Sequence, residues 1–350
     1  MFSKNLKYYR LKSRLTKKEL AEKVNVSAMA ITNYENGTRK PSMDILNSLA
    51  EALNIRVSDF LAVRNENLVF SHGEFRKTSS LSASQQEYVR ESVEEYFSRF
   101  MTAVEVLGGD VLPDAPVCHA IPLSNDAEKN AGMLRKHLGF SLSGPVEDLI
   151  GKLENCGILI CECNPENSSF SGMNGFVNGR PYIVLNPEMT AERNRSTAVH
   201  ELAHLMFVWP DGMEEKEAEK MATAIGGAFL FPEADAVREL GVHRSAITND
   251  MLSVAGEYGI SMMLLVKRAE ICGIITSSAA REFYIKASRA GWRTAEPSRI
   301  TKEESTLFQQ LVYRAVNENE ISIQKGAELL NTSYESILRM NGSIEVKPCI

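Results

Sequence analysis

His200, Glu201 and His204 form the pattern H-E-x-x-H. The mostly apolar run around them, residues 196–207, predicts a buried helix. Residues four apart lie on one face of a helix, so both imidazoles could bind one Zn²⁺. Glu201 would lie beside them, where a carboxylate can take a proton from a water that the metal has acidified. The pattern predicts a zinc site with Glu201 as general base, and the alternative is a chance match within an ordinary core helix.

A catalytic zinc site also needs a third protein ligand and one open position for water. The helix expected after His204 is rich in acidic residues, so spacing alone leaves several candidates: Glu214, Glu215, Glu217 and Glu219. For each of them the alternative interpretation is a solvated helix face.

Three apolar runs before the H-E-x-x-H helix predict strands, because each is bounded by residues that favour turns: residues 157–163, 171–177 and 179–186. They place a small sheet directly before the helix. A sheet edge can bind an extended peptide by strand addition. We therefore expect an edge of this sheet to hold a peptide next to the metal.

Apolar residues at helical spacing predict further helices over residues 85–107, 127–138 and 146–155. Pro145 stands at the favoured first position of the last one. From residue 64 to about 86 the chain is polar and rich in serine. This composition predicts a linker with some local order around Phe70 and Phe75.

The composition of the 350 residues, 44% hydrophobic and 24% charged, is that of a globular protein, and the length favours two or three domains. The first residues lack the apolar core of a signal peptide, and no apolar run approaches the roughly 20 residues that would span a bilayer. We expect a cytoplasmic protein without membrane contact. Six cysteines without a C-x-x-C pair suggest neither a disulfide framework nor a zinc ribbon.

The net charge of −6 is unevenly distributed along the chain. Residues 1–64 carry 12 Lys and Arg against 6 Asp and Glu, which gives +6, whereas residues 65–350 carry 27 against 39, which gives −12. A basic N-terminal segment followed by an acidic remainder indicates an anionic partner for the N-terminal segment alone.

The basic segment is expected to be helical throughout. Thr16 and Glu19 form a capping box that begins one helix, and Ser27 can cap the next, residues 28–35. Asn36 and Gly37 end that helix, and a further helix begins after Pro41 and Ser42. Two short helices joined by a tight turn, within a five-helix unit, predict a helix-turn-helix.

Residues 4–61 resemble the XRE, phage-repressor-like family of DNA-binding domains, through the stretch L-T-K-K-E-L-A-E-K-V-N-V-S-A-M-A-I-T-N-Y-E-N-G-T-R-K-P. The resemblance implies that the second motif helix enters the major groove and presents Ala28, Met29, Thr32 and Asn33 to base edges. It implies phosphate contacts for Lys17, Asn36, Arg39 and Lys40.

Two of these positions depart from the polar pairs often found in the family. Ala28 and Met29 cannot donate hydrogen bonds, so they could contact a thymine methyl, or the domain reads sequence only weakly. For Lys17, Arg39 and Lys40 the alternative is a solvated face. Arg10 and Glu35 match a structural ion pair of the family.

Residues of about 120–285 resemble the ImmA/IrrE family of zinc metallopeptidases. The resemblance lies in R-x-R-S-x-x-x-H-E-L-x-H at residues 193–204 and in the acidic helix that ends in F-L-F-P at residues 229–232. The family pattern E-x-x-A-N-x-F-A-x-x-L-L-x-P, counted back from Pro232, selects Glu219 as third ligand. A register on Glu215, with Glu219 as a supporting acid, loses the fit to Pro232. Thr223 stands where the pattern has Asn, which leaves open the group that orients the ligating histidine.

We therefore expect an α+β fold, mostly α, in four parts. These are a helix-turn-helix domain (1–64), a linker and connecting helix (65–110), a zincin-like domain with a small sheet and the H-E-x-x-H helix (111–290), and a helical C-terminal region (291–350). Fusion of an XRE domain to this metallopeptidase domain is a known arrangement in the ImmA/IrrE family.

The resemblance implies a zinc endopeptidase, attached to a sequence-specific DNA-binding domain, that cuts a regulatory protein, typically a repressor of stress-response or mobile-element genes. Its partners would be DNA and that protein, and a homodimer is one possible assembly. The alternatives are a transcriptional regulator whose zinc fold senses a metal or a partner, and an antitoxin-like component of a two-gene locus. Glu201 between the two histidines favours the enzyme, because a structural zinc site has no use for a general base.

Overall fold

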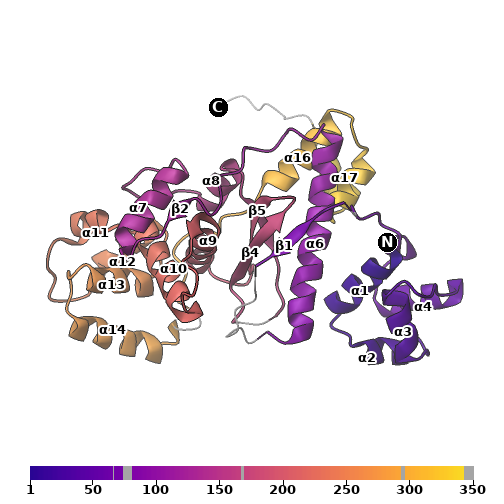
Figure 1. The fold of residues 1–350 in the computed structure, drawn as a ribbon, viewed down its shortest axis with the longest axis horizontal. Helices are drawn as coiled ribbons and strands as arrows, with labels where there is room; N and C mark the ends of the chain where they lie inside the picture. The colour runs from indigo at the N-terminus through magenta and orange to yellow at the C-terminus, as the bar shows by residue number, and fades with distance from the viewer. Residues whose placement is uncertain (66, 74–80, 167–168, 293–295, 343–350) are drawn as a thin grey trace, which may run out of the picture.

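The computed structural model describes residues 1–350 except 66, 74–80, 167–168, 293–295 and 343–350. The fold is α+β and mostly helical, as predicted. Figure 1 shows the long helix α6 (Ala83–Val106) between the helical N-terminal unit and the strands. Within the described ranges no helix has both the length and the apolar composition needed to cross a membrane.

The N-terminal unit consists of five helices, as predicted: α1 (Phe2–Lys12), α2 (Lys17–Lys23), α3 (Ala28–Glu35), α4 (Met43–Ala52) and α5 (Val57–Phe60). Thr16 and Glu19 form the expected capping box at α2, and the Ser27 side chain caps α3. Between the two helices Asn25 has a φ of 54°, a left-handed conformation that asparagine tolerates. The predicted helix-turn-helix is therefore present.

The larger sheet has the strand order β1-β4-β5-β3. Its strands are β1 (Phe70–His72), β3 (Leu159–Glu162), β4 (Gly172–Val177) and β5 (Arg180–Leu185). β4 and β5 form an antiparallel hairpin, and β3 pairs with β5 in parallel. Asn178 and Gly179 connect the hairpin with φ angles of 50° and 76°, which suits a two-residue turn. β2 (Ile121–Pro122) and β6 (Phe207–Val208) form a separate parallel pair.

The segment that we predicted to be a linker contributes β1 to the sheet. Phe70, Ser71 and His72 pair with β4 in antiparallel register, so the local order that we expected around Phe70 is present, but as a strand of the sheet, which we did not predict. We expected that an edge of this sheet could hold a peptide, and one such edge, the outer edge of β4, is covered by the chain itself over residues 175–177. A strand of three residues is too short to produce a recognisable alternation of apolar and polar side chains. Phe75, the other residue at which we expected order, lies outside the described residues.

Alternate side chains of β5 pack against different helices. Tyr182 and Val184 belong to a hydrophobic cluster with α6, whereas Ile183 and Leu185 belong to one with α9 (Ala191–Met206). The sheet is therefore buried on both faces, with α6 and α9 on opposite sides. α10 (Glu215–Leu230) packs against α9 and against α7 (Ala127–His137).

The remaining helices are α8 (Leu149–Asn155), α11 (Glu233–Leu240), α12 (Asp250–Tyr258), α13 (Met262–Ile271), α14 (Ser277–Arg289), α16 (Leu307–Asn317), α17 (Ile323–Leu330) and α18 (Tyr334–Met340). The prediction that α8 starts at Pro145 was wrong. Asp148 caps this helix by accepting a hydrogen bond from Gly151 N–H, and its φ of 45° turns the chain at the helix start.

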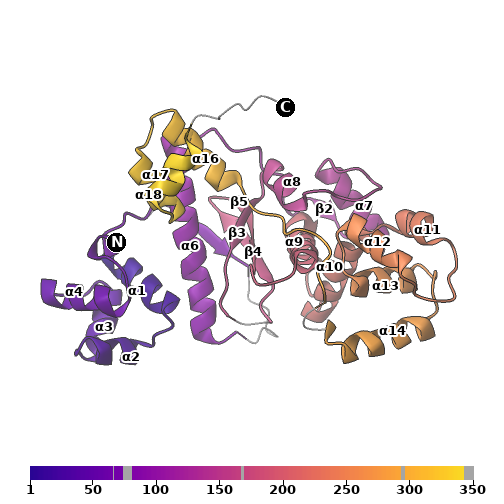
Figure 2. The ribbon, with the colours of Figure 1, turned by 180° about the vertical axis from the view of Figure 1, so that it is seen from behind.

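The C-terminal helices pack on α6, as Figure 2 shows. Phe308, Leu311 and Val312 of α16 share one hydrophobic cluster with Phe97 and Phe100 of α6 and with the sheet. The division of the chain at residues 64, 110 and 290 stays a prediction. The packing shows that the connecting helix, the sheet and the C-terminal region have a common core.

Residues 296–306, which we call the C-terminal strap, contact buried charged side chains of α8 and α9. Glu192 of α9 accepts hydrogen bonds from Ser298 Oγ at 2.9 Å and Arg299 N–H at 2.7 Å. Glu154 of α8 accepts hydrogen bonds from the hydroxyl of Ser305 and from two backbone amides of the strap and α16. Glu303 forms an ion pair with Arg195 of α9, whose side chain is 4% exposed.

Replacing Glu303 with alanine should lower the free energy of unfolding by about 3 kcal/mol, because Arg195 would keep a buried charge without its carboxylate. Thermal denaturation of the full chain measures the effect. Glu304→Ala is the matched control, since Glu304 is the exposed neighbour of Glu303. Equal loss of stability in the two variants would contradict the assignment of this ion pair to the strap.

Candidate metal centre

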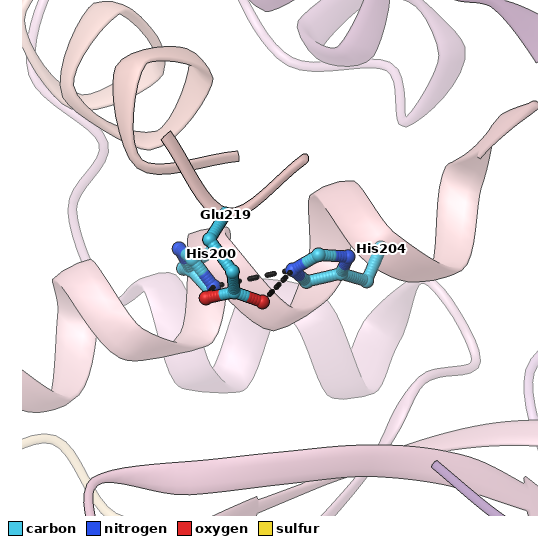
Figure 3. A group of neighbouring side chains, drawn as sticks. All are labelled: His200, His204 and Glu219. Carbon is cyan, nitrogen blue, oxygen red and sulfur yellow. Dashed lines mark hydrogen bonds and ion pairs between the residues drawn. The ribbon is translucent and has the colours of Figure 1, made fainter. Parts of the chain in front are cut away.

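Three side chains converge where α10 crosses α9 (Figure 3). His200 Nε2 and His204 Nε2 are 3.2 Å apart, and the Glu219 carboxylate oxygens lie 3.3 Å and 3.2 Å from them. One ligand atom from each residue can be chosen so that all lie within 4.8 Å of one another. Two imidazole nitrogens and a carboxylate aimed at one point are a donor set for a divalent metal ion.

Helix packing accounts for the position of Glu219. Gly226 of α10 lies against α9, and a Cβ built on it would be 3.7 Å from the backbone nitrogen of His200. Glu219 precedes Gly226 by two helical turns and therefore lies on the same face of α10. Ala222, fully buried between them, keeps this face flat. The small residues thus let α10 approach α9 closely enough for Glu219 to reach both imidazoles.

Thr223 stands where the family pattern has Asn, and its hydroxyl orients the His200 imidazole. Its hydroxyl donates to the backbone carbonyl of Glu219 at 2.8 Å and lies 3.2 Å from His200 Nδ1. Because the hydroxyl proton is used on Glu219, Oγ1 accepts from His200 Nδ1–H. In that tautomer Nε2 carries no proton, and its lone pair lies on the side of His204 and Glu219.

Glu201 is held from the sheet. Its side chain is buried, and its Oε2 accepts a hydrogen bond of 2.8 Å from Asn174 Nδ2 of β4. Sequence reasoning did not find Asn174. The alternation of β4 places it on the face toward α9, but only the packing of the two elements brings it to Glu201. A hydrogen bond to one carboxylate oxygen fixes the other in place.

The other acidic candidates do not join this cluster. Glu214, Glu215 and Glu217 are exposed at the start of α10. On the far side of His204, Trp209 stacks on the imidazole with ring centroids 5.1 Å apart. The His204 and Glu219 side chains keep 21% and 25% of their surface, so solvent reaches this end of the cluster.

The residues that we expect to contact DNA are exposed or partly exposed. Ala28, Met29, Asn36, Arg39 and Lys40 are exposed, and Thr32 and Asn33 are partly exposed. Thr32 donates its hydroxyl to the Ala28 carbonyl at 3.1 Å, as threonine often does within a helix.

The two ion-pair residues of the N-terminal unit are buried. Arg10 and Glu35 form the predicted structural ion pair inside the unit. Lys17 lies 3.5 Å from the Glu35 carboxylate, so its ammonium is partly engaged within the protein.

Two known families match separate parts of the chain. A helix-turn-helix family matches residues 6–60, and a peptidase family described as the IrrE N-terminal-like domain matches residues 153–270. The chain therefore joins an XRE-type helix-turn-helix domain to an IrrE/ImmA-like domain.

One curated relative is consistent with the helix-turn-helix domain. Over 70 residues the chain is 33% identical to an uncharacterized HTH-type transcriptional regulator, YqaE, of Bacillus subtilis (strain 168). The match covers 20% of this chain and 60% of that protein, so the chain spans well under the whole length of this relative. No solved structure matches the chain. The function of the IrrE/ImmA-like half therefore has to be argued from its own residues.

Replacing Thr223 with valine should weaken binding of a divalent ion by about 10- to 100-fold, because His200 Nδ1–H would lose its acceptor while the ligand atoms remain. Titration with Co²⁺, followed by its absorption spectrum, measures the affinity. Thr223→Ser keeps the hydroxyl and is the control. Unchanged affinity in Thr223→Val would contradict the orienting role of this residue.

Proposed function

We propose that the protein is a zinc-dependent endopeptidase attached to a DNA-binding domain. The observation that carries the proposal is the buried Glu201 beside the three convergent donors His200, His204 and Glu219. Ligand atoms around a tetrahedral zinc ion at 2.0 to 2.1 Å are about 3.3 Å apart. The two imidazole nitrogens, 3.2 Å apart, fit that geometry, and each has one of the two Glu219 carboxylate oxygens within 3.3 Å.

A Zn²⁺ ion held there would supply a Lewis acid that acidifies a water molecule and polarises a peptide carbonyl. Glu201 then acts as general base, taking the proton of the attacking water and passing it to the leaving amine. Asn174 keeps Glu201 oriented through both proton transfers by holding one of its oxygens. Thr223 keeps His200 in the tautomer that leaves its Nε2 unprotonated.

The DNA-binding domain supports a regulatory protein as the substrate class, with a repressor as the main candidate. A peptidase that is attached to a helix-turn-helix domain meets proteins bound at nearby sites on DNA at a raised local concentration. The general-base position of Glu201 argues against a pure metal sensor, because sensing requires ligands and not a base.

Glu201→Gln should retain metal and fold while losing cleavage of the substrate, because the amide cannot take a proton. Co-expression with the protein encoded by each neighbouring gene, followed by gel electrophoresis and mass spectrometry, identifies the substrate and the cut site. Cleavage by Glu201→Gln at the wild-type rate would rule out this mechanism. If neither protein cuts any candidate, the sensor alternative is favoured.

Two glutamine variants of α10 provide the matched comparison for that experiment. Glu219→Gln should lose zinc, measured as metal content of the purified protein, and should lose activity with it. Glu215→Gln should retain both, because Glu215 is exposed and outside the donor cluster. Loss of zinc only in Glu215→Gln would overturn the choice of ligand.

The full chain should bind DNA with an affinity that falls steeply with salt, since residues 1–64 carry a charge of +6 and displace condensed counterions. Arg39→Ala should weaken binding to all duplexes alike and lower the salt slope by about one. Asn33→Ala should instead cost roughly 1 to 3 kcal/mol on the preferred site and little elsewhere. Titrations against specific and random duplexes at several salt concentrations separate the two, and salt-independent binding would contradict the phosphate contacts.

A further inference from the structure

β4 is the strand of the sheet that runs beside the candidate metal centre. Its residues 172, 174 and 176 face α9. A Cβ built on Gly172 would lie 2.7 Å from the Thr197 side chain, and Asn174 hydrogen-bonds Glu201. Phe176 continues this face farther along and packs against His119. An extended peptide added to the outer edge of β4 would therefore pass next to Glu201.

That outer edge is occupied by the chain itself. Gly73 N–H donates to the Asn174 carbonyl at 2.8 Å, and Asn178 N–H donates to the Val69 carbonyl at 2.8 Å. β1 pairs with β4 between these two bonds. The backbone carbonyl of Asn174, the residue that hydrogen-bonds Glu201, therefore already accepts a hydrogen bond from β1. A substrate strand cannot pair with the same backbone groups while β1 is bound.

The occupying strand is three residues long, and the His72 side chain connects it to β5 and to α6. His72 Nδ1 lies 2.7 Å from the Tyr182 hydroxyl, and His72 Nε2 lies 3.5 Å from Glu94 of α6. Ser71 is exposed. Val69 N–H also donates to Asn178 Oδ1 at 2.8 Å, and Phe70 packs against the cluster formed with α6. A strand of three residues at the edge of a sheet is nonetheless among the parts of a fold that open most easily.

β1 also follows directly on the DNA-binding domain. Arg64 donates to the Asn5 side chain of α1 at 2.7 Å and lies 3.4 Å from Glu91 of α6. Lys7 of α1 forms an ion pair with Glu87 and Glu91. Loss of these contacts, when the N-terminal unit moves on α6, would release the chain just before β1.

We propose that β1 is an internal occupant of the peptide-binding edge, so that the protein is autoinhibited while β1 pairs with β4 and open to an extended protein substrate once β1 leaves. The inference rests on the proposed peptidase function. It identifies β1 as the regulatory element, and the outer edge of β4 as the site that β1 shares with substrate.

Ser71→Pro tests the proposal without touching β4 or the metal ligands. Pairs alternate along an antiparallel ladder, so the Gly73 bond makes Ser71 and Phe176 a hydrogen-bonded pair. Proline removes the donor of that pair. Ser71→Ala keeps the backbone donor and is the matched control. Gly73→Val is a second releasing variant, because its Cβ would lie 2.6 Å from the Asn174 carbonyl oxygen.

Two measurements separate binding from catalysis. Fluorescence anisotropy with a fluorescein-labelled peptide of residues 67–73 reports whether the edge is open, and amide hydrogen exchange of Phe176 checks that β1 has left it. Cleavage of fluorescein-labelled casein, an unfolded polypeptide, reports activity of the zinc-loaded full chain. We expect Ser71→Pro and Gly73→Val to bind the peptide at least tenfold more tightly than the wild type and Ser71→Ala, and to cleave casein at least tenfold faster.

The outcomes distinguish this inference from the proposed function. If the wild type cleaves casein as fast as an opened variant, the peptidase stands and autoinhibition by β1 is overturned. If opened variants fail to bind the peptide, the edge is not a strand-binding site and the inference is again overturned. If opened variants bind the peptide but no zinc-loaded protein cleaves casein or a co-expressed partner, the proposed peptidase function fails and regulation of cleavage fails with it.

Discussion

The close contact between α9 and α10 is the constraint on which the candidate site depends. A metal site of this kind needs three donors within a few ångströms, and α9 alone supplies only His200 and His204. The third donor comes from a helix whose distance is set by Ala222 and Gly226, because larger side chains there would push α10 away. Such a displacement would carry both Glu219 and Thr223 away from the histidines. The position of a carboxylate and the tautomer of an imidazole therefore depend on the same packed surface.

The sheet supplies the other half of the site and connects it to the rest of the chain. β4 contributes Asn174 on its α9 face, while Met173 and Val177 on the opposite face belong to the cluster formed with α6. α6 in turn contacts α1 of the DNA-binding domain and the C-terminal helices. A shift of α6 would therefore displace β4, the strand that hydrogen-bonds Glu201. The structure provides a continuous set of packed elements between the DNA-binding domain and Glu201.

Local signals in the sequence were sufficient for much of the architecture. Capping residues such as Ser27 predicted helix starts. The preference for Glu219 over Glu215 came from the family resemblance, through the pattern counted back from Pro232, and Glu219 is the one that lies in the donor cluster. What failed were features decided by long-range contacts. The pairing of β1 with β4 joins residues about a hundred positions apart and has no local signature. Thr223 looked like the loss of an orienting group, yet its hydroxyl oxygen accepts a hydrogen bond from His200 Nδ1–H, because the hydroxyl proton is donated to the Glu219 carbonyl. No spacing rule contains that information.

Two helix pairs, α2–α3 near the N-terminus and α17–α18 near the C-terminus, have the same turn geometry but differ in charge. α17 and α18 repeat the turn of α2 and α3: Asn331 has a φ of 50° where Asn25 has 54°, Ser333 caps the second helix as Ser27 does, and Ile337 is as fully buried as Ile31. The charges differ. Residues 307–342 carry three basic and four acidic side chains, whereas residues 1–64 carry an excess of six positive charges. Affinity for nucleic acid comes largely from Lys and Arg side chains that displace counterions at phosphates, and residues 307–342 have no excess of such side chains. The turn geometry shared by the two helix pairs is therefore not accompanied by a shared excess of positive charge.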